Sequence, residues 1–322
     1  MAARHIFMHS SLEGMSNGDY FNYLMQYLKD SAHAIEVCSQ YSVYESCLRF
    51  QSTAHDDIIV AIIDMVRFKH ELIPFLRGIT SGELTTRTRV ILLSSLLTWS
   101  GHSSVTSIES IEMALKSRVP VHAYAETLQL ENSCFALSSS TFEAVVIGKG
   151  LIYGRNGFDF FPIMKSFLSD DNIVPIMHPA EASAPAIHID DLCSIVEHLI
   201  SADYIPLYVP AVDACPDTLH SIITNIANEF DVSGFKYCEL ENLLHFAIEN
   251  SQSTNLFHSN LKFSNLPTQN ISLKYPQGLS KENLPVIVSE YKTLNNLSPC
   301  RLMVVGMPYA GKTTVAKSIA QM

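Results

Sequence analysis

The chain has 322 residues, of which 47% are hydrophobic and 16% charged, and its formal net charge is −11. This composition supports a large core, suggests about two domains and argues against global disorder. The acidic balance and the lack of a run of basic residues argue against a nucleic-acid surface, because phosphate contacts need clustered Lys and Arg. No apolar run is long enough for a membrane span. The seven scattered cysteines predict reduced cytosolic thiols.

Apolar strands alternate with amphipathic helices over the first two thirds of the chain. The predicted strands read HIFMHS, AIEVCSQ, DIIVAIID, RVILLSSL, VVIGKGLIYG, AIHI and PLYVPA. Helices with an apolar stripe include YFNYLMQYL, DDLCSIVEHLIS and DTLHSIITNIANEF. We expect Asp190 or Asp191 to cap the second of these helices and Asp217 to cap the third. The alternation predicts an α/β fold of Rossmann type, with a doubly wound parallel sheet.

Changes in composition divide the chain into four predicted parts. Residues 1–247 form the Rossmann-like domain. Residues 248–280 are rich in Asn and Ser without a sustained period, which predicts a linker. Residues 281–299 hold a connecting helix, and residues 300–322 form the last part, which carries a nucleotide-binding motif. The inward side of the connecting helix is predicted to hold Leu284, Ile287, Val288, Tyr291 and Leu294.

Three stretches of the first domain resemble the extended short-chain dehydrogenase family, the Rossmann-type epimerases and reductases. LLSSL is similar to the strand that ends in that family's active-site serine. AVVIGKGLIYGRNG is similar to the strand and turn before its substrate region, and AIHIDDL to the strand-to-helix junction ahead of its last helices. Their order along the chain is the stronger evidence, and the resemblance implies that family's fold.

The cofactor-binding chemistry of that family is missing from the first domain. The family has a glycine-rich loop after its first strand, where the backbone approaches the cofactor pyrophosphate. Here the loop reads SSLEGMSNG, in which Gly14 and Gly18 have the wrong spacing and Glu13 adds a negative charge. The second strand ends in CSQ, without an acid to hold a ribose. We therefore predict no dinucleotide-binding residues and no NAD(P).

The family's catalytic Tyr-x-x-x-Lys pair is missing as well. Matching the chain to the family's helix places Arg118 at the Tyr position and His122 at the Lys position. Tyr124 lies nearby, but Leu128 follows it at the Lys spacing. Neither pairing provides a proton donor beside a cation that lowers its pKa. The first domain is therefore predicted to be a scaffold without dehydrogenase activity.

The other polar residues of these stretches are interpreted as structural. Ser94 and Ser95 are expected to form a strand end or a cap, because no base is found beside them. Asp190 and Asp191 could be paired carboxylates, but their place at a helix start favours capping. Tyr153 is expected to pack in the interior.

The most specific motif lies near the end of the printed sequence. Residues 306–313 read G-x-x-x-x-G-K-T, the phosphate-binding loop pattern, between an apolar strand and a helix. Backbone N–H groups would bind phosphate oxygens, Lys312 would reach the β- and γ-phosphates, and the Thr313 hydroxyl would take Mg²⁺. This predicts a site for ATP with Mg²⁺, in which Lys312 is the catalytic residue. The predicted phosphate-binding residues are Gly306, Ala310, Gly311, Lys312, Thr313 and Thr314.

The loop also resembles that of adenylate kinases, which commonly reads G-x-P-G-x-G-K. Tyr309 replaces its second glycine, and Thr313 stands where those enzymes often have Gly. A degenerate dehydrogenase-like domain, a polar linker, a helix and this loop, in that order, resemble the adenylate kinase type 7 family of cilia and flagella. The resemblance implies conversion of ATP and AMP to two ADP, and a cytoplasmic protein of the ciliary or flagellar axoneme. It also implies axonemal protein partners, docked by the first domain, and neither nucleic acid nor membrane.

Two alternatives to a kinase remain open at this point. The chain could be a purely structural axonemal subunit whose loop binds nucleotide poorly, or an NAD(P)-dependent reductase or epimerase. One strand, one loop and part of one helix cannot bury a core of their own. We therefore expect residues 300–322 to be only the start of a kinase domain and the chain as given to be inactive. Lid and acceptor-site arginines in the full-length protein would favour the enzyme.

Overall fold

A computed structural model describes most of the Rossmann-like domain and parts of the chain between residues 255 and 296. The described residues are 5–9, 20–31, 33–38, 43–51, 58–83, 85–99, 106–108, 111–155, 158–168, 172–177, 182–238, 255–263 and 271–296. The degenerate loop with Glu13, Gly14 and Gly18 lies outside these residues, and so does the whole of 300–322.

The described elements alternate as the sequence predicts. The strands are β1 (His5–His9), β2 (Ala34–Cys38), β3 (Ile59–Asp64), β4 (Thr88–Ser95), β5 (Thr106–Ile108), β6 (Phe142–Lys149), β7 (Leu151–Tyr153), β8 (Ile173–Val174), β9 (Ala186–His188), β10 (Tyr208–Ala211), β11 (Lys236–Tyr237) and β12 (Leu261–Phe263). The α-helices are α1 (Tyr20–Asp30), α2 (Val43–Gln51), α3 (Met65–Ser81), α4 (Ile111–Ala114), α5 (Ala125–Leu137), α6 (Phe161–Ser166), α7 (Ile189–Ser201), α8 (Leu219–Glu229) and α11 (Leu284–Asn296). Short 3₁₀ turns are η1 (Leu96–Thr98), η2 (Leu115–Ser117), η3 (His122–Tyr124) and η4 (Phe158–Phe160).

The main sheet has six parallel strands in the order β10-β6-β4-β3-β1-β2. The chain builds β2 on one side of β1 and then crosses to the other side to build β3. The topological switch point, where doubly wound sheets bind ligands, therefore lies at the carboxyl ends of β1 and β3. The parallel register brings Ser94 opposite Gly148 and Ser95 opposite Lys149 at the same edge. The predicted Rossmann-like sheet is confirmed.

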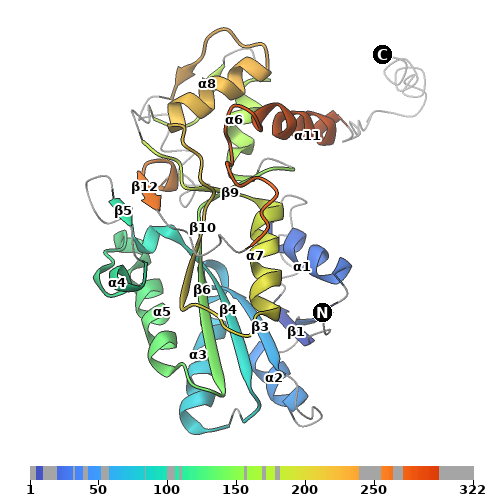
Figure 1. The fold of residues 1–322 in the computed structure, drawn as a ribbon, viewed down its shortest axis with the longest axis vertical. Coiled ribbons are helices and arrows are strands. Elements are labelled where there is room, and N and C mark those ends of the chain that lie inside the picture. The colour runs from blue at the N-terminus through green and yellow to red at the C-terminus, as the bar shows by residue number, and fades with distance from the viewer. Residues whose placement is uncertain are drawn as a thin grey trace, which may run out of the picture.

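Helices cover both faces of this sheet, so its strands are apolar on both sides. Figure 1 shows α3 and α5 on one face and α1 and α7 on the other. Alternate residues of one strand enter two separate cores: Ala144 and Val146 of β6 face one, and Val145 and Ile147 face the other. This burial on both faces explains why the predicted strands read as nearly continuous apolar runs.

A smaller group of elements lies beyond the carboxyl ends of the main strands. It contains α6, α8 and α11, which Figure 1 shows above the sheet. Short parallel pairs belong to it: β7 with β9, β8 with β11, and β5 with β12. Within the range predicted as a linker, β12 thus pairs with β5, and residues 271–280 lead into α11. AIHI was predicted as a strand; it forms β9, which pairs with β7 outside the main sheet.

Three details of the helices differ from prediction. His188 is the N-cap of α7, because its side chain accepts a hydrogen bond from the Asp190 N–H. Thr218, and not Asp217, caps α8 by accepting from Ser221 N–H. On α11, Leu284, Ile287, Val288 and Tyr291 are buried as predicted, whereas Leu294 is 37% exposed. The stripe of α11 ends one turn earlier because no described residue covers its last turn.

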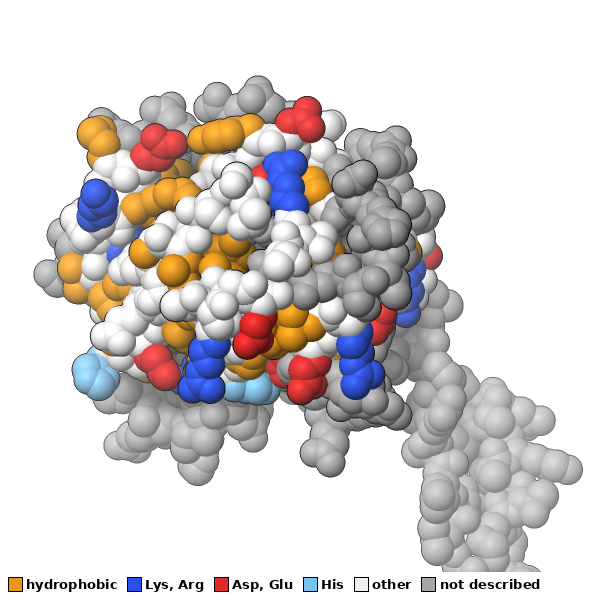
Figure 2. Space-filling view, turned by 90° about the horizontal axis from the view of Figure 1, so that it is seen from below, with side chains coloured by type: hydrophobic (Ala, Val, Ile, Leu, Met, Phe, Trp, Pro, Cys, Tyr) orange, Lys and Arg blue, Asp and Glu red, His pale blue; other side chains and the backbone are white. Residues whose placement is uncertain are grey.

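The opposite end of the sheet carries charges of both signs. Figure 2, which views the molecule from this end, shows Lys and Arg side chains interspersed with Asp and Glu among the described residues. Glu143 pairs there with Arg87 and with the buried Arg89. Arg89 also donates to the carbonyls of Leu199 and Ala202, both at 2.7 Å, and so caps the end of α7. No described helix is long and apolar enough to cross a membrane.

Candidate functional site

Three polar side chains meet at the switch point, and we call them the sheet-edge cluster: Tyr20, Asp64 and Lys149. Tyr20 is the first residue of α1, Asp64 ends β3, and Lys149 ends β6. The Tyr20 hydroxyl donates to Asp64 Oδ2 and accepts from Lys149 Nζ. Lys149 Nζ also lies 3.7 Å from Asp64 Oδ2 and 4.0 Å from the centre of the Tyr20 ring. These contacts join α1 to the far side of the switch point.

Each member of the sheet-edge cluster is buried and fixed by its element. Asp64 is fully buried, and its Oδ1 accepts from Val66 N–H at 3.0 Å, which caps α3. Lys149 is 3% exposed and Tyr20 is 8% exposed. An ammonium and a carboxylate this deeply buried persist only when each is paired, since desolvation of either one alone is costly. The three side chains of the cluster therefore compensate one another.

A second buried polar cluster lies beside Ser94. Arg118 and Glu131 are both fully buried and form an ion pair, and the Ser94 hydroxyl donates to Glu131 Oε1. The Arg118 guanidinium also lies 5.3 Å from the Trp99 ring and 5.2 Å from the Tyr208 ring. Burial raises the pKa of Glu131, against the opposing effect of Arg118. Arg118, at the position of the family's tyrosine, is thus a packed structural cation.

The other residues that were compared with dehydrogenase positions also make only structural contacts among the described residues. Ser95 caps η1, since its hydroxyl accepts from Leu97 N–H at 3.2 Å, which confirms the predicted cap. His122 begins the exposed turn η3, and Tyr124 ends it with a pKa that burial raises to about 12. Tyr153 is fully buried, as predicted, and donates to Asp213 Oδ2 at 2.9 Å. One helical turn after Tyr124 stands Leu128 and not a Lys.

Asp190 and Asp191 hold a C-terminal segment onto the core, and we call this contact the strap anchor. Asp191 is fully buried and accepts from the backbone N–H groups of Lys274 at 2.5 Å and of Tyr275 at 2.9 Å. Asp190 accepts from Lys274 Nζ at 3.1 Å and from Tyr23 Oη at 2.7 Å. The segment 271–280 is thereby fixed at the start of α7. The predicted capping role of the two aspartates is wrong, because His188 caps the helix and frees both for the segment.

Arg155 completes the surroundings of Asp190. It has a left-handed backbone conformation, with φ of 50°, directly after Gly154, and its guanidinium lies 3.1 Å from Asp190 Oδ2. Hydrogen bonds from Tyr23, Lys274 and Arg155 lower the pKa of Asp190 although burial opposes them. Asp190 is therefore ionised at neutral pH and compensates two cations.

His188 faces α11 from the floor of this region. It is fully buried, and desolvation lowers its pKa to about 4, so the ring is neutral at pH 7. Since its Nδ1 accepts from Asp190 N–H, the proton is on Nε2. Nε2 lies 3.9 Å from Glu290 Oε2, and neither atom has a hydrogen-bond partner among the described residues. The ring also packs on Tyr275, with centroids 4.3 Å apart.

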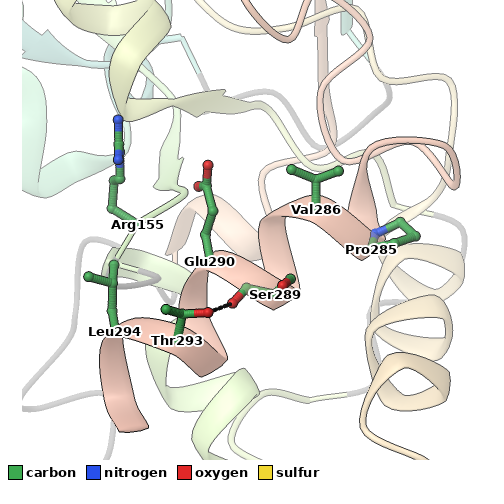
Figure 3. A pocket seen from close by; sticks show the side chains of 7 residues that line it. All are labelled: Arg155, Pro285, Val286, Ser289, Glu290, Thr293 and Leu294. Atoms are coloured by element: carbon green, nitrogen blue, oxygen red, sulfur yellow. Dashed lines mark hydrogen bonds between the residues drawn. The ribbon is translucent and has the colours of Figure 1, made fainter. Parts of the chain in front are cut away.

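Arg155 lines two open cavities. One, of about 370 Å³, is lined by Tyr23, Tyr27, Arg155, Asp190, Ser194 and residues 272–274. The other, of about 510 Å³, lies over α11 and is drawn in Figure 3. There Arg155 and Glu290 project into the same space, while Val286 and Leu294 flank them along the helix. The second cavity combines apolar walls with one cation and one acid.

The predicted nucleotide site lies outside the described residues. This holds for Gly306, Ala310, Gly311, Lys312, Thr313 and Thr314, and so for the proposed Mg²⁺ ligand. Among the residues that the structure describes, no group of three or more His, Cys, Asp or Glu could hold a metal ion. The six described cysteines are free thiols.

Sequence reasoning missed the sheet-edge cluster and the strap anchor. Lys149 stands inside the predicted apolar strand VVIGKGLIYG and Asp64 ends the predicted strand DIIVAIID, and both are positions where a charge needs a partner. These two residues were the signal in the sequence that could have indicated a buried polar cluster. Their common partner, Tyr20, is 129 residues from Lys149 and 44 from Asp64.

Two known proteins with sequences similar to this chain are both named adenylate kinase 7. Adenylate kinase 7 from Mus musculus is 26% identical over 207 residues, which are 62% of this chain and 33% of that protein. Adenylate kinase 7 from Macaca fascicularis is 25% identical over 190 residues, 58% of this chain and 36% of that protein. The chain spans about a third of the length of these relatives. No family model matches the chain.

Solved structures with a similar fold include an epimerase family protein and a dehydratase, each with a nicotinamide cofactor. A human epimerase family protein with NADPH superposes with a TM-score of 0.59 and 14% identity, over 91% of this chain and all of that one. A dTDP-glucose 4,6-dehydratase from Bacillus anthracis with NAD gives a TM-score of 0.61 and 11% identity, over 91% and 98%. At these identities the likeness establishes the fold alone. The comparisons show that this chain is similar to adenylate kinase 7 over about 60% of its length and shares its fold with epimerase-family and dehydratase structures.

Proposed function

We propose that this adenylate kinase 7-like chain is part of an axonemal adenylate kinase. In this proposal the Rossmann-like domain is a docking module that binds no dinucleotide. Residues 300–322 supply the phosphate-binding loop for transfer between ATP and AMP in the full-length protein. The substrates are then ATP, AMP and ADP, with Mg²⁺, and the partners are proteins of the ciliary or flagellar axoneme.

The sheet-edge cluster is the observation that carries the first half of this proposal. A dinucleotide needs backbone N–H groups and open space at the switch point for its pyrophosphate. Here Tyr20 reaches across that point to Asp64 and Lys149, so three side chains of the protein occupy the edge. Opening the edge would leave Lys149 and Asp64 with fewer partners in a buried place, which is unfavourable.

The absence of a Tyr–Lys pair supports the same conclusion about catalysis. Hydride transfer in this fold needs a tyrosine proton donor beside a cation that lowers its pKa. The pKa of Tyr124 is raised to about 12 by burial, and Leu128 stands one turn after it. A fold kept without such a pair is consistent with a docking role, in which the surface and not the interior is functional.

The phosphate loop carries the second half of the proposal. Its glycines, Lys312 and Thr313 have the spacing that phosphate-binding loops need, and the named relatives are adenylate kinases. Lys312 would place an ammonium at the β- and γ-phosphates, where charge develops during transfer. Thr313 would hold Mg²⁺ through its hydroxyl.

Replacement of Lys312 tests this assignment. We expect Lys312→Ala to lower ADP formation from ATP and AMP by about 10²-fold or more in the full-length protein, because such electrostatic contacts contribute several kcal/mol to the transition state. Lys312→Arg is the matched control for charge, and we expect no rescue, since a planar guanidinium does not replace a compact ammonium. Unchanged activity of Lys312→Ala would remove the loop from the mechanism, and an inactive wild-type protein would favour a purely structural subunit.

A further inference from the structure

The cavity of about 370 Å³ lies between α1, the start of α7 and the segment 271–280, and the proposed function leaves it without a role. Its lining includes Tyr23 and Tyr27 of α1, Leu273 of the segment, and two cations, Arg155 and Lys274. Figure 1 shows α1 and α7 on one face of the sheet and α5 on the other. The cavity therefore lies across the sheet from α5 and from the polar cluster beside Ser94.

Two half-exposed cations share a single acid in this cavity. Arg155 Nη2 and Lys274 Nζ each lie 3.1 Å from Oδ2 of Asp190, and the side chains of the two cations are 40% and 48% exposed. Asp190 also accepts from Tyr23 Oη at 2.7 Å, so its two oxygens already take hydrogen bonds from three side chains. Among the lining residues the two cations outnumber the one acid, in a chain whose net charge is −11.

Donors without an acceptor remain in the cavity. Arg155 bonds Asp190 through Nε and Nη2, and no described residue accepts from its Nη1. Lys274 Nζ donates to Asp190 and lies 4.9 Å from the centre of the Tyr275 ring, while Glu290 Oε1, at 3.9 Å, is beyond hydrogen-bond distance. The group that would complete these contacts is an acceptor with negative charge.

Apolar surface accompanies these donors. Tyr23 and Tyr27 are one helical turn apart on α1, and their hydroxyls donate to Asp190 and, at 3.1 Å, to Glu197. Because both hydroxyls are bonded, the two rings and Leu273 supply the apolar part of the lining. Small-molecule sites combine apolar walls with a few placed polar groups in volumes of about 300–1,000 Å³. The cavity has this composition and this size.

We infer that this cavity binds a small aromatic carboxylate, with its oxygens on Arg155 and Lys274 and its ring beside Tyr23 and Tyr27. A guanidinium and an ammonium recognise a carboxylate through charge-assisted hydrogen bonds. One negative charge balances the excess cation of the lining, whereas a phosphate monoester, with about −1.5 to −2 at pH 7, overcompensates it beside Asp190.

The acids just outside the lining favour a ligand with a single negative charge as well. Glu197 accepts from Tyr27, and Glu290 lies 3.9 Å from Lys274. Each would repel a second negative charge on the ligand. The inference is independent of the proposed kinase role, because the cavity contains no residue of the phosphate loop.

Calorimetric titration of the 322-residue chain with benzoate tests the inference. We expect benzoate to bind, and Arg155→Asn or Lys274→Met to weaken binding by about tenfold or more, since each removes a hydrogen bond to a charged group. Asn is chosen because it tolerates the left-handed backbone conformation of Arg155. The matched controls are Arg87→Asn and Lys69→Met, whose side chains are 45% and 47% exposed and which each pair with one glutamate. Both controls should bind benzoate as the wild type does.

Hydrogen exchange locates the bound benzoate. The N–H groups of Lys274 and Tyr275 donate to Asp191, and a ligand that joins Lys274 to Arg155 should stabilise this part of the segment. At a benzoate concentration of about twice Kd, exchange of these two amides should slow by about threefold. The amides of α5, across the sheet, should be unaffected.

Four results would overturn the inference. Absence of benzoate binding at millimolar concentration would mean that the two cations serve only to hold the segment. Equal binding by Arg155→Asn would place the ligand elsewhere, and equal binding of neutral benzyl alcohol would exclude recognition of the charge. Tighter binding of phenyl phosphate than of benzoate, with protection of Lys274 and Tyr275, would contradict a singly charged ligand. Loss of ADP formation in Lys312→Ala concerns the kinase role alone and leaves benzoate binding unchanged.

Discussion

The sheet-edge cluster and the strap anchor each contain a buried aspartate near a lysine, but they connect different parts of the chain. In the first, Tyr20, Asp64 and Lys149 connect elements of the Rossmann-like core across its own switch point. In the second, Asp190 and Asp191 reach to Lys274 and Tyr275, more than 80 residues later in the chain. The first arrangement lies at the switch point, where doubly wound sheets bind ligands. The second fixes the segment that leads into α11 to the start of α7. Buried polar groups thus stabilise the Rossmann-like core in the sheet-edge cluster and attach the segment 271–280 to that core in the strap anchor.

Removing the acid of the sheet-edge cluster should have the largest effect. Asp64→Ala leaves the buried Lys149 ammonium without its carboxylate and removes the cap of α3. We expect the free energy of unfolding to fall by about 3–5 kcal/mol, the usual range for breaking a buried pair. Urea unfolding measures this change.

A double variant provides the control for that prediction. Adding Lys149→Met removes the unpaired charge, so Asp64→Ala with Lys149→Met should be more stable than Asp64→Ala alone. If the two changes simply add, the pair does not interact as the geometry indicates.

Breaking the strap anchor should have a smaller and more local effect. Asp191→Ala removes the acceptor of two backbone N–H groups, each bonded to a charged oxygen, and we expect a loss of about 2–3 kcal/mol. Residues 271–296 should become sensitive to proteolysis before the main sheet does, because the segment is bonded to α7 and not to a strand of the sheet. Asp217→Ala, at the residue that does not cap α8, is the matched control and should change little. Simultaneous loss of the sheet and the segment would contradict a separate anchor.

The pH dependence of stability should sharpen the same contrast between the two sites. Burial raises the pKa of Asp213 to about 7, and this residue packs against Gly278 of the anchored segment. Because the folded carboxyl holds its proton where the unfolded one, with a pKa near 3.8, has lost it, its contribution to stability decreases as pH rises from about 4 to 7. The slope for one such group is at most about 1.4 kcal/mol per pH unit.

Asp213→Asn isolates that contribution from those of other groups. His188, whose pKa is lowered to about 4, acts in the opposite direction between about pH 4 and 6.5, so wild-type curves alone are not diagnostic. Relative to Asp213→Asn, the wild type should lose stability between pH 5 and 7 in urea unfolding. A constant difference between the two proteins over this range would contradict the assignment.

Local sequence patterns predicted the fold but not the contacts that close the site. DIIVAIID and VVIGKG gave β3 and β6 because strands buried on both faces must be apolar throughout. The cap of α7 was misassigned because an aspartate is the usual N-cap, whereas here a histidine accepts the bond. Tyr20 and Lys149 become neighbours only when β1, β3 and β6 take their places in the parallel sheet. Nothing in a single sequence reports a pairing over 129 residues.

Calorimetric titration of the 322-residue chain with NAD⁺ and NADPH tests the central claim most directly. The claim is that the sheet-edge cluster occupies the crevice in which similar folds bind a dinucleotide. We predict no heat of binding for either cofactor at micromolar to millimolar concentrations. Micromolar binding of NAD⁺ or NADPH would contradict the account and would restore the reductase or epimerase alternative.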